Sequence, residues 1–146
     1  MELSVRYKGE EHVLQVKEDD IILFPSGLVG FSQWRRFVLL EDPDEAPIAI
    51  LQCLDDIKVC FLVTDPSYVS PNYSVQLPAE ELEKLGLSRM EDSRVLCTLT
   101  LKDGPAVVTA NLLGPILINP EARVARQVIL QDSPYSAQHP VLMVRA

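Results

Sequence analysis

The chain has 146 residues, of which 47% are hydrophobic, and a formal net charge of −8. This length fits one domain, and the apolar fraction excludes a disordered tail. No apolar stretch reaches the roughly 18–20 residues of a membrane helix, and the charged N-terminus is unlike a signal peptide, so we expect a cytoplasmic protein without membrane contact.

The negative charge is concentrated in the middle of the chain. Residues 41–92 hold 12 acids and 3 bases, whereas residues 1–40 hold 6 and 5 and residues 93–146 hold 3 and 5. An acidic surface disfavours direct nucleic-acid binding, which depends on phosphate contacts. It favours a basic partner and speeds the encounter at low salt, while plain solubility is the alternative interpretation.

The first half of the chain predicts short strands of alternating or continuous apolar residues. We expect strands at residues 3–7, 12–16, 21–24, 37–40, 48–54 and 58–64. The first two form a hairpin, and Asp55-Asp56 joins the last two in another. Gly27 and Gly30 predict a turn with special backbone angles, and Ser32 is expected to cap one helical turn through residue 37.

The second half opens on a loop rich in proline and tyrosine at residues 65–73. One helix is predicted at residues 79–85, because acids fill its first turn and Gly86 follows it. Leu82 and Leu85 are expected to face inward. Residues 88–91 have the spacing of a capping box and predict a second short turn.

Strand signals then resume to the end of the chain. We expect strands at residues 95–101, 106–113, 116–118, 126–130 and 141–144, with a turn at Asp103-Gly104. Signals recur every 8–15 residues without strand–helix alternation. The pattern predicts an all-β, mainly antiparallel fold, a single β-barrel-like domain over residues 1–146 with one short helix inserted.

The most distinctive stretch is the apolar segment 109–120, which is broken by Gly114-Pro115. We interpret it as a strand pair with a bend at a barrel corner. Asn111 and Asn119, near its two ends, are expected to satisfy nearby backbone groups. The segment contains no residue suited to catalysis.

A search for catalytic or metal-binding motifs finds none that is specific. Cys53, Cys60 and Cys97 are widely spaced and are interpreted as buried free thiols. His12 and His139 have no nucleophile or ligand partner near them in the sequence. Neither a phosphate-binding loop nor a zinc-protease motif occurs. We therefore expect no enzymatic activity, no metal and no cofactor.

The aromatic residues in the loops indicate a binding protein more strongly than any motif indicates an enzyme. Tyrosine is a frequent interface anchor, and a proline-rich loop presents it rigidly. The loop from Asp65 to Tyr73 is therefore the best binding-site candidate, with Tyr68 and Asn72 inside it. The alternative is that these rings fold back on the barrel. Phe31, near the glycine turn, belongs to a second aromatic group with Trp34.

Four motifs are spread over nearly the whole chain. They are F-P-S-G-L-V-G-F at residues 24–31 followed by Phe37, Asp65-Pro66 with Tyr73, T-A-N-L-L-G-P-I-L-I-N at residues 109–119, and Q-V-I-L at residues 127–130 followed by Tyr135. In the same order and spacing, they resemble the motifs of the flagellar assembly factor FliW family. The family often has proline where this chain has Val29. The motif residues Gly27, Gly30, Phe31, Asn111, Pro115 and Asn119 are interpreted as structural.

The resemblance implies a cytoplasmic, non-enzymatic β-barrel that binds flagellin and the translational regulator CsrA. Bound to CsrA, such proteins stop it from repressing flagellin mRNA, so the mechanism is a partner switch. We expect no direct contact with nucleic acid, and a monomer.

The acidic residues 41–92 are expected to face CsrA, with Asp55, Asp56, Asp65, Tyr68, Asn72 and Tyr73 as candidate partner-binding residues. Reversing Asp55 and Asp56 to lysine should slow association and weaken its salt dependence. Flagellin is expected on an apolar surface or a free strand edge. The alternatives are a small β-barrel ligand-binding protein or enzyme, and an interaction module outside motility.

Overall fold

The structure, a computed structural model, describes residues 1–7, 10–102 and 107–141. These residues form eleven strands: β1 Glu2–Tyr7, β2 Glu10–Gln15, β3 Ile21–Leu23, β4 Arg36–Leu40, β5 Ala49–Cys53, β6 Cys60–Thr64, β7 Arg94–Lys102, β8 Val107–Ala110, β9 Ile116–Asn119, β10 Val124–Gln127 and β11 His139–Pro140. The described residues contain one α-helix, α1 Ala79–Lys84, and four 3₁₀ turns, η1 Glu18–Asp20, η2 Pro43–Glu45, η3 Pro66–Tyr68 and η4 Met90–Asp92.

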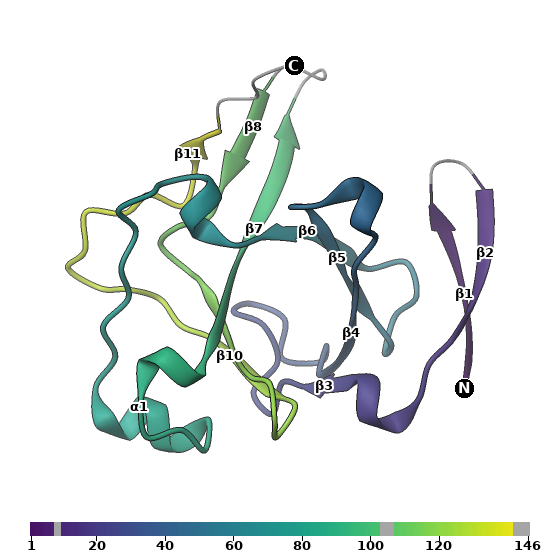
Figure 1. Cartoon of the computed structure of the whole chain (residues 1–146), viewed down its shortest axis with the longest axis horizontal. Coiled ribbons are helices and arrows are strands. Elements are labelled where there is room, and N and C mark those ends of the chain that lie inside the picture. Colours follow the sequence, from purple (N-terminus) through teal and green to yellow (C-terminus); the bar gives the residue numbers. More distant parts are fainter. Residues whose placement is uncertain (8–9, 103–106, 142–146) are drawn as a thin grey trace.

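Seven of the strands close into a barrel (Figure 1). The order is β7–β6–β5–β4–β3–β10–β9, and β9 pairs back onto β7 to complete the ring. All pairings are antiparallel except the one between β3 and β10. β8 and β11 continue the sheet beyond β7, while β1 and β2 form a separate hairpin at the side of the barrel. The predicted mainly antiparallel, barrel-like fold is confirmed.

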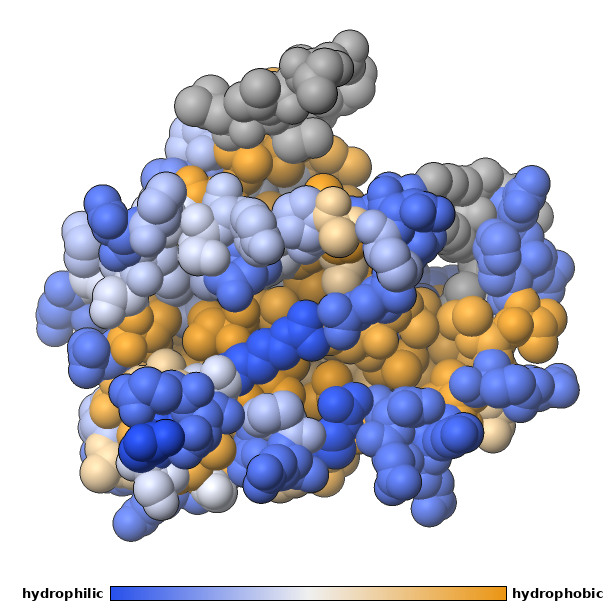
Figure 2. All heavy atoms as spheres, viewed as in Figure 1, coloured by the Kyte–Doolittle hydropathy of each residue, from blue (hydrophilic) through white to orange (hydrophobic). Residues whose placement is uncertain are grey.

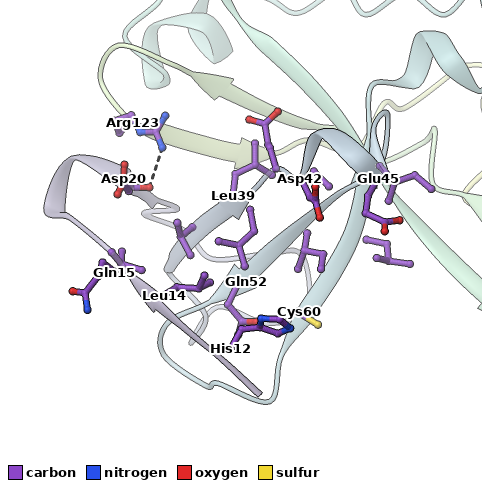
Figure 3. A pocket seen from close by; sticks show the side chains of 18 residues that line it. His12, Leu14, Gln15, Asp20, Leu39, Asp42, Glu45, Gln52, Cys60 and Arg123 are labelled. Carbon is purple, nitrogen blue, oxygen red and sulfur yellow. Dashed lines mark hydrogen bonds between the residues drawn. The ribbon is translucent and has the colours of Figure 1, made fainter. Parts of the chain in front are cut away.

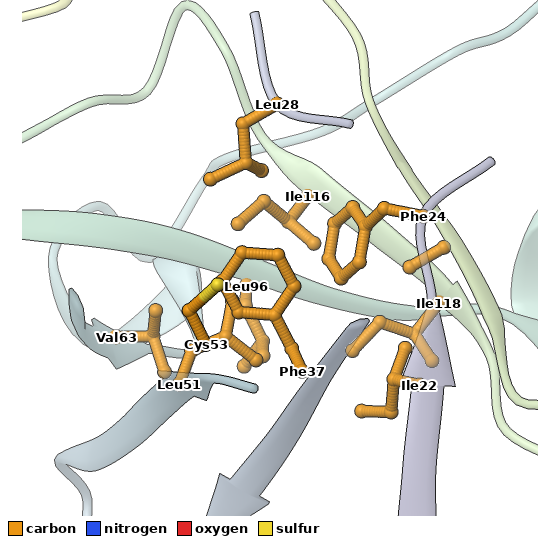
Figure 4. Packing of buried hydrophobic residues seen from close by; sticks show 11 residues of the cluster. Ile22, Phe24, Leu28, Phe37, Leu51, Cys53, Val63, Leu96, Ile116 and Ile118 are labelled. Atoms are coloured by element: carbon orange, nitrogen blue, oxygen red, sulfur yellow. The ribbon is translucent and has the colours of Figure 1, made fainter. Parts of the chain in front are cut away.

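Large side chains fill the interior of the barrel (Figure 4). Alternate residues of each strand point inward, so strands far apart in the sequence contribute to one cluster. It comprises Ile22, Phe24, Leu28, Phe37, Leu51, Cys53, Val63, Leu96, Ile116, Ile118 and Ala125. The rings of Phe24 and Phe37 meet edge to face, with centroids 4.9 Å apart. The interior is thus a packed core.

Three smaller apolar clusters lie outside the barrel wall, each beneath a different covering element. The N-terminal hairpin packs Leu3 and Val16 against Val38 of β4. Helix α1 and the segments around it bury Leu117 of β9, and Cys97 of β7 is buried under the loops near Tyr73 and Tyr135. Leu82 and Leu85 are buried, as predicted for the helix.

In the distinctive segment 109–120, the end of β8 and all of β9 follow one another with a bulge between them, so the predicted strand pair with a bend is confirmed. β8 and β9 both run antiparallel along the same edge of β7, where Ala110 pairs with Leu99 and Ile116 pairs with Leu96. Between these pairs β7 advances three residues while its partner advances six. Three extra residues are therefore looped out around Gly114, and the strand turns from the β11 side into the barrel.

The asparagines of this segment hold its irregular backbone, as predicted. Asn111 Oδ1 accepts a hydrogen bond from the Gly114 N–H at 2.8 Å inside the bulge. Asn119 Nδ2 donates to the Leu85 carbonyl at 2.8 Å, at the end of α1. Asn119 Oδ1 accepts the N–H groups of the next turn, at residues 121 and 122. Pro115 is fully buried beside the bulge.

Several local expectations are wrong or lie outside the described residues. Residues 33–37 form no helical turn and enter β4 instead, and β10 begins two residues before the predicted strand at 126–130. The turn at 88–91 becomes η4, without a side-chain capping bond. Cys60 is exposed rather than buried. Asp103-Gly104 and residues 142–144 are not described.

The two glycines of the 25–31 turn both have positive φ, as predicted, but their surroundings differ. Gly27 has φ +69°, and a Cβ there would lie 2.6 Å from the Phe31 carbonyl oxygen. Gly30 has φ +84° with nothing within 4 Å of such a Cβ. Gly27 is thus required by both backbone angle and space, Gly30 by angle alone.

Replacing Gly27 with alanine should therefore destabilise the fold more than replacing Gly30. We expect about 1 kcal/mol for Gly30→Ala from the left-handed backbone alone, and about 3 kcal/mol for Gly27→Ala, where steric overlap adds to it. Urea unfolding followed by the fluorescence of Trp34, the sole tryptophan, measures both. Equal losses would contradict the assigned crowding at Gly27.

Candidate functional site

A groove of about 740 Å³ lies between the N-terminal hairpin and the outer face of β4–β6 (Figure 3). One wall is β2, with His12 and Leu14. The floor comes from the barrel strands, including Leu40, Ile50 and Leu62. In Figure 3 the side chains of the hairpin and those of the barrel border the same space.

The groove exists because β4, β5 and β6 are apolar on both faces. Successive residues of a strand point to opposite sides, so the runs 37–40, 49–51 and 61–63 place apolar groups outside as well as inside. Leu40 pairs with Ile50, Ile50 with Leu62, and Leu62 with Leu99, which makes one row across the outer wall.

Only the two ends of this row are covered by the clusters described above. Leu40 packs against the hairpin cluster, and Leu99 packs under the loops near Tyr135. Ile50 and Leu62, in the middle, are half-buried and line the groove. Figure 2 shows apolar surface running from the barrel toward the hairpin. The groove is therefore the uncovered centre of an apolar outer face.

Acidic residues line one end of the groove, in the loop between β4 and β5. Glu41, Asp42 and Glu45 border the cavity. Glu41 forms a two-pronged ion pair with Arg94, with both N–O distances 3.0 Å. The hydrogen bond from Arg94 lowers the pKa of Glu41. Asp42 Oδ1 caps η2 by accepting the Asp44 N–H at 2.9 Å. The loop is thus anchored with its carboxylates at the groove.

Arg123 and Asp20 border the groove elsewhere, from the β9–β10 turn and η1. Arg123 Nη2 donates to the Asp20 carbonyl oxygen at 2.9 Å. Its Nε is buried and has no hydrogen-bond partner among the described residues. Within the part of the chain that the structure describes, four carboxylates and this guanidinium line the cavity, which makes that border acidic.

Asp55 and Asp56 occupy the β5–β6 turn and hold backbone there. Asp55 Oδ2 accepts the N–H groups of Arg35 and Arg36, each at 2.8 Å, and Oδ1 pairs with the Arg36 side chain at 2.9 Å. Asp56 Oδ1 accepts the Lys58 N–H at 3.1 Å. Asp55 is thus a structural carboxylate, whereas Asp56 has a single local contact and is exposed.

The four candidate residues of the 65–73 loop divide into anchored and exposed groups. Asp65 caps η3 by accepting the Ser67 N–H at 2.8 Å. Tyr73 donates its hydroxyl to the Leu112 carbonyl at 2.7 Å and packs on Tyr135, and burial raises its pKa. Tyr68 is 69% exposed, and Asn72 is exposed. Asp65 and Tyr73 also border a second cavity of about 330 Å³.

The candidate residues do not form one site. Asp55-Asp56 precede β6, and the 65–73 loop follows it. The five extended residues of β6 are about 17 Å long, so the turn and the loop lie at opposite ends of this strand. The loop lies at the same end of the sheet as Glu41 and Asp42, because β4 ends and β6 ends there. Phe31 stacks on Trp34 with centroids 4.4 Å apart, and Trp34 directly precedes Arg35, whose N–H bonds to Asp55.

Sequence reasoning missed the groove, although a signal was present. Three neighbouring strands with apolar residues at consecutive positions must be covered on both faces. One hairpin and one short helix are too few to cover both faces of these strands, so part of the apolar outer face is expected to stay uncovered.

Within residues 1–7, 10–102 and 107–141, no three His, Cys, Asp or Glu side chains gather to hold a metal. Burial raises the pKa of the Cys97 thiol to about 12.

The closed barrel has a packed interior and a groove on its outside. Together they define a small β-barrel protein whose candidate binding groove lies on the outer wall of the barrel. In the described residues, no helix has the length and hydropathy to span a bilayer. The FliW protein family model matches residues 8–142. A crystal structure of the flagellar assembly factor FliW superposes with a TM-score of 0.87 at 31% identity, covering all of both chains.

Curated relatives are similar to this chain in sequence over most of their own lengths. The flagellar assembly factor FliW of Bacillus subtilis is 34% identical over 97% of this chain and 96% of its own. The Bdellovibrio bacteriovorus protein of the same name is 36% identical over 88% of this chain and 73% of its own. The chain belongs to the FliW family of flagellar assembly factors.

Asp55 should stabilise the β5–β6 turn in a pH-dependent way. Burial raises its pKa, but the hydrogen bonds from Arg35 and Arg36 outweigh this, so the folded pKa lies below 3.8. Its contribution is complete above the unfolded pKa and is lost as pH falls through the lower folded pKa. We expect Asp55→Ala to lose about 2 kcal/mol at pH 7 and Asp56→Ala about 0.5 kcal/mol.

Thermal unfolding at pH 7 and at successively lower pH measures this difference. The gap between wild type and Asp55→Ala should shrink as pH falls below 3.8. A gap that stays constant with pH would show that the Asp55 charge does not hold the turn.

Proposed function

We propose that this chain is a cytoplasmic, non-enzymatic binding protein that binds flagellin and the translational regulator CsrA. Binding to CsrA relieves the repression of flagellin mRNA, and flagellin that accumulates recaptures the factor. The single observation that carries the proposal is family membership over nearly the whole chain, with four ordered motifs. A partner switch needs two binding surfaces and no chemical step.

We assign CsrA to the acidic end of the sheet, where the β4–β5 loop and the 65–73 loop lie together. Glu41, Asp42 and Asp44 come from the first loop and Asp65 from the second, and Arg94 is the cation that pairs with Glu41. An RNA-binding protein presents basic surface, which this end complements. Tyr68, exposed in the same region, supplies an aromatic anchor.

The anchored roles of Asp55 and Tyr73 change how the assignment is tested. Reversing Asp55 would break the β5–β6 turn, and replacing Tyr73 would expose the Tyr135 cluster. Tyr68→Ala removes exposed surface alone. Ile57→Ala is the matched control, because Ile57 is 48% exposed at the opposite end of β6.

We expect the purified chain to retain both flagellin and CsrA from its own organism, and to release CsrA from flagellin leader RNA in a gel-shift assay. Tyr68→Ala should weaken CsrA binding about tenfold, with Ile57→Ala unchanged. Affinity for CsrA should fall as salt rises. Retention of neither partner at low salt would refute the proposed function, and equal loss in both variants would refute the assigned surface.

Asp56→Asn tests whether the CsrA contact extends to the β5–β6 turn. The substitution removes one exposed charge and keeps an oxygen that can accept the Lys58 N–H. We expect slower association at low salt if that turn faces CsrA. An unchanged association rate would confine the contact to the acidic end.

A further inference from the structure

We propose that the groove between β2 and the outer face of β4–β6 is a docking site for one amphipathic α-helix with lysine or arginine along its flanks. This rests on the proposed function in one respect, since it takes the helix to be supplied by flagellin. The floor, the border and the strand pairing each support this kind of occupant.

The floor fits a helix in width and chemistry. Leu40, Ile50 and Leu62 form one row across three adjacent strands. With strands about 4.8 Å apart, the row is about 10 Å wide, close to the diameter of an α-helix with its side chains. The volume of about 740 Å³ also lies within the range of binding pockets.

Strand pairing excludes the addition of an extended peptide at the floor. β5 is paired with β4 on one side and β6 on the other, and β6 is paired with β5 and β7. The backbone N–H and C=O groups of β5 and β6 are therefore already hydrogen-bonded to neighbouring strands, and the floor presents only side chains. An occupant of the floor therefore makes side-chain contacts there, which suits a helix, because a helix satisfies its own backbone groups.

The charge of the border selects the flanks of the helix. Asp42 and Glu45 lie at one end of the groove and Asp20 at another, and Arg123 is the guanidinium among the described lining residues. Glu41 is neutralised by its ion pair with Arg94. A helix that buries an apolar stripe on Ile50 and Leu62 would carry its lysine or arginine flanks toward these carboxylates.

One reporter of occupancy needs no substitution. Of the three cysteines, Cys53 and Cys97 are buried and Cys60 is exposed and lines the groove. A thiol reagent should therefore modify Cys60 first. Occupancy by the helix should slow this reaction.

The test uses the full-length chain with flagellin and with synthetic peptides. One peptide is an amphipathic helix with lysine flanks, stapled or linear; a second has glutamate flanks; a third is the lysine peptide with its sequence scrambled. We expect the lysine helix to bind and to slow Cys60 alkylation at least tenfold at saturation. The stapled form should bind more tightly than the linear one, because its helix is preorganised.

Two pairs of variants locate the contact. Leu62→Gln should weaken binding about tenfold, whereas Leu101→Gln, at an exposed leucine outside the groove, should not. D42N/E45Q should weaken binding about threefold at low salt and flatten its salt dependence. E83Q/E91Q is the control, since it removes the same charge from exposed positions away from the groove.

Three outcomes would overturn the inference: glutamate or scrambled peptide binding as well as the lysine helix, the stapled form binding more weakly than the linear one, or Cys60 staying fully reactive at saturation. Wild-type binding to flagellin that Leu62→Gln leaves intact would place flagellin elsewhere while the proposed function stands. Failure of wild type to bind flagellin, with the lysine helix still bound in the groove, would refute the function instead.

Discussion

The bulge between β8 and β9 is the constraint on which the rest of the structure depends. β7 is hydrogen-bonded along both edges, and the bulged strand lines one of them from end to end. Without the three extra residues, the segment would continue straight along β7, and β9 could not leave the plane of β8 to reach β10. The bond from Gly114 N–H to Asn111 therefore sits where the barrel closes. The motif most useful for recognising the family is also the corner of its fold.

Local signals predicted the hairpins and the helix well, because turn chemistry and strand alternation act over a few residues. The failures have longer-range causes. Residues 33–37 have a serine at a capping position, but the Arg35 and Arg36 N–H groups bond to Asp55, twenty residues away, and draw the segment into β4. β10 starts early because Asn119 accepts two N–H groups of a tight turn, which brings Val124 opposite it.

The candidate site shows the same division. Exposure of Tyr68 and Asn72 follows from their place in a polar loop, and the loop position of Asp65 was clear from the sequence. The anchoring of Tyr73 was not, since its hydroxyl bonds to Leu112, thirty-nine residues on. The groove depends on which parts of the outer wall the hairpin and the loops cover, and that is set by tertiary packing. The loop between β4 and β5 borders both the groove and the acidic end, so the two proposed partners share one element.

The N-terminal hairpin has a consequence for the range of shapes that the groove can hold. Its strands pair with each other and not with the barrel, and an apolar cluster of Leu3, Val16 and Val38 joins it to the wall. Apolar contact has no preferred direction, unlike a ladder of hydrogen bonds. Tilting the hairpin exposes surface at about 25 cal/mol per Å² and breaks no strand pairing of the barrel. The groove thus has a rigid floor and an adjustable wall, so its width can change while the barrel keeps its register.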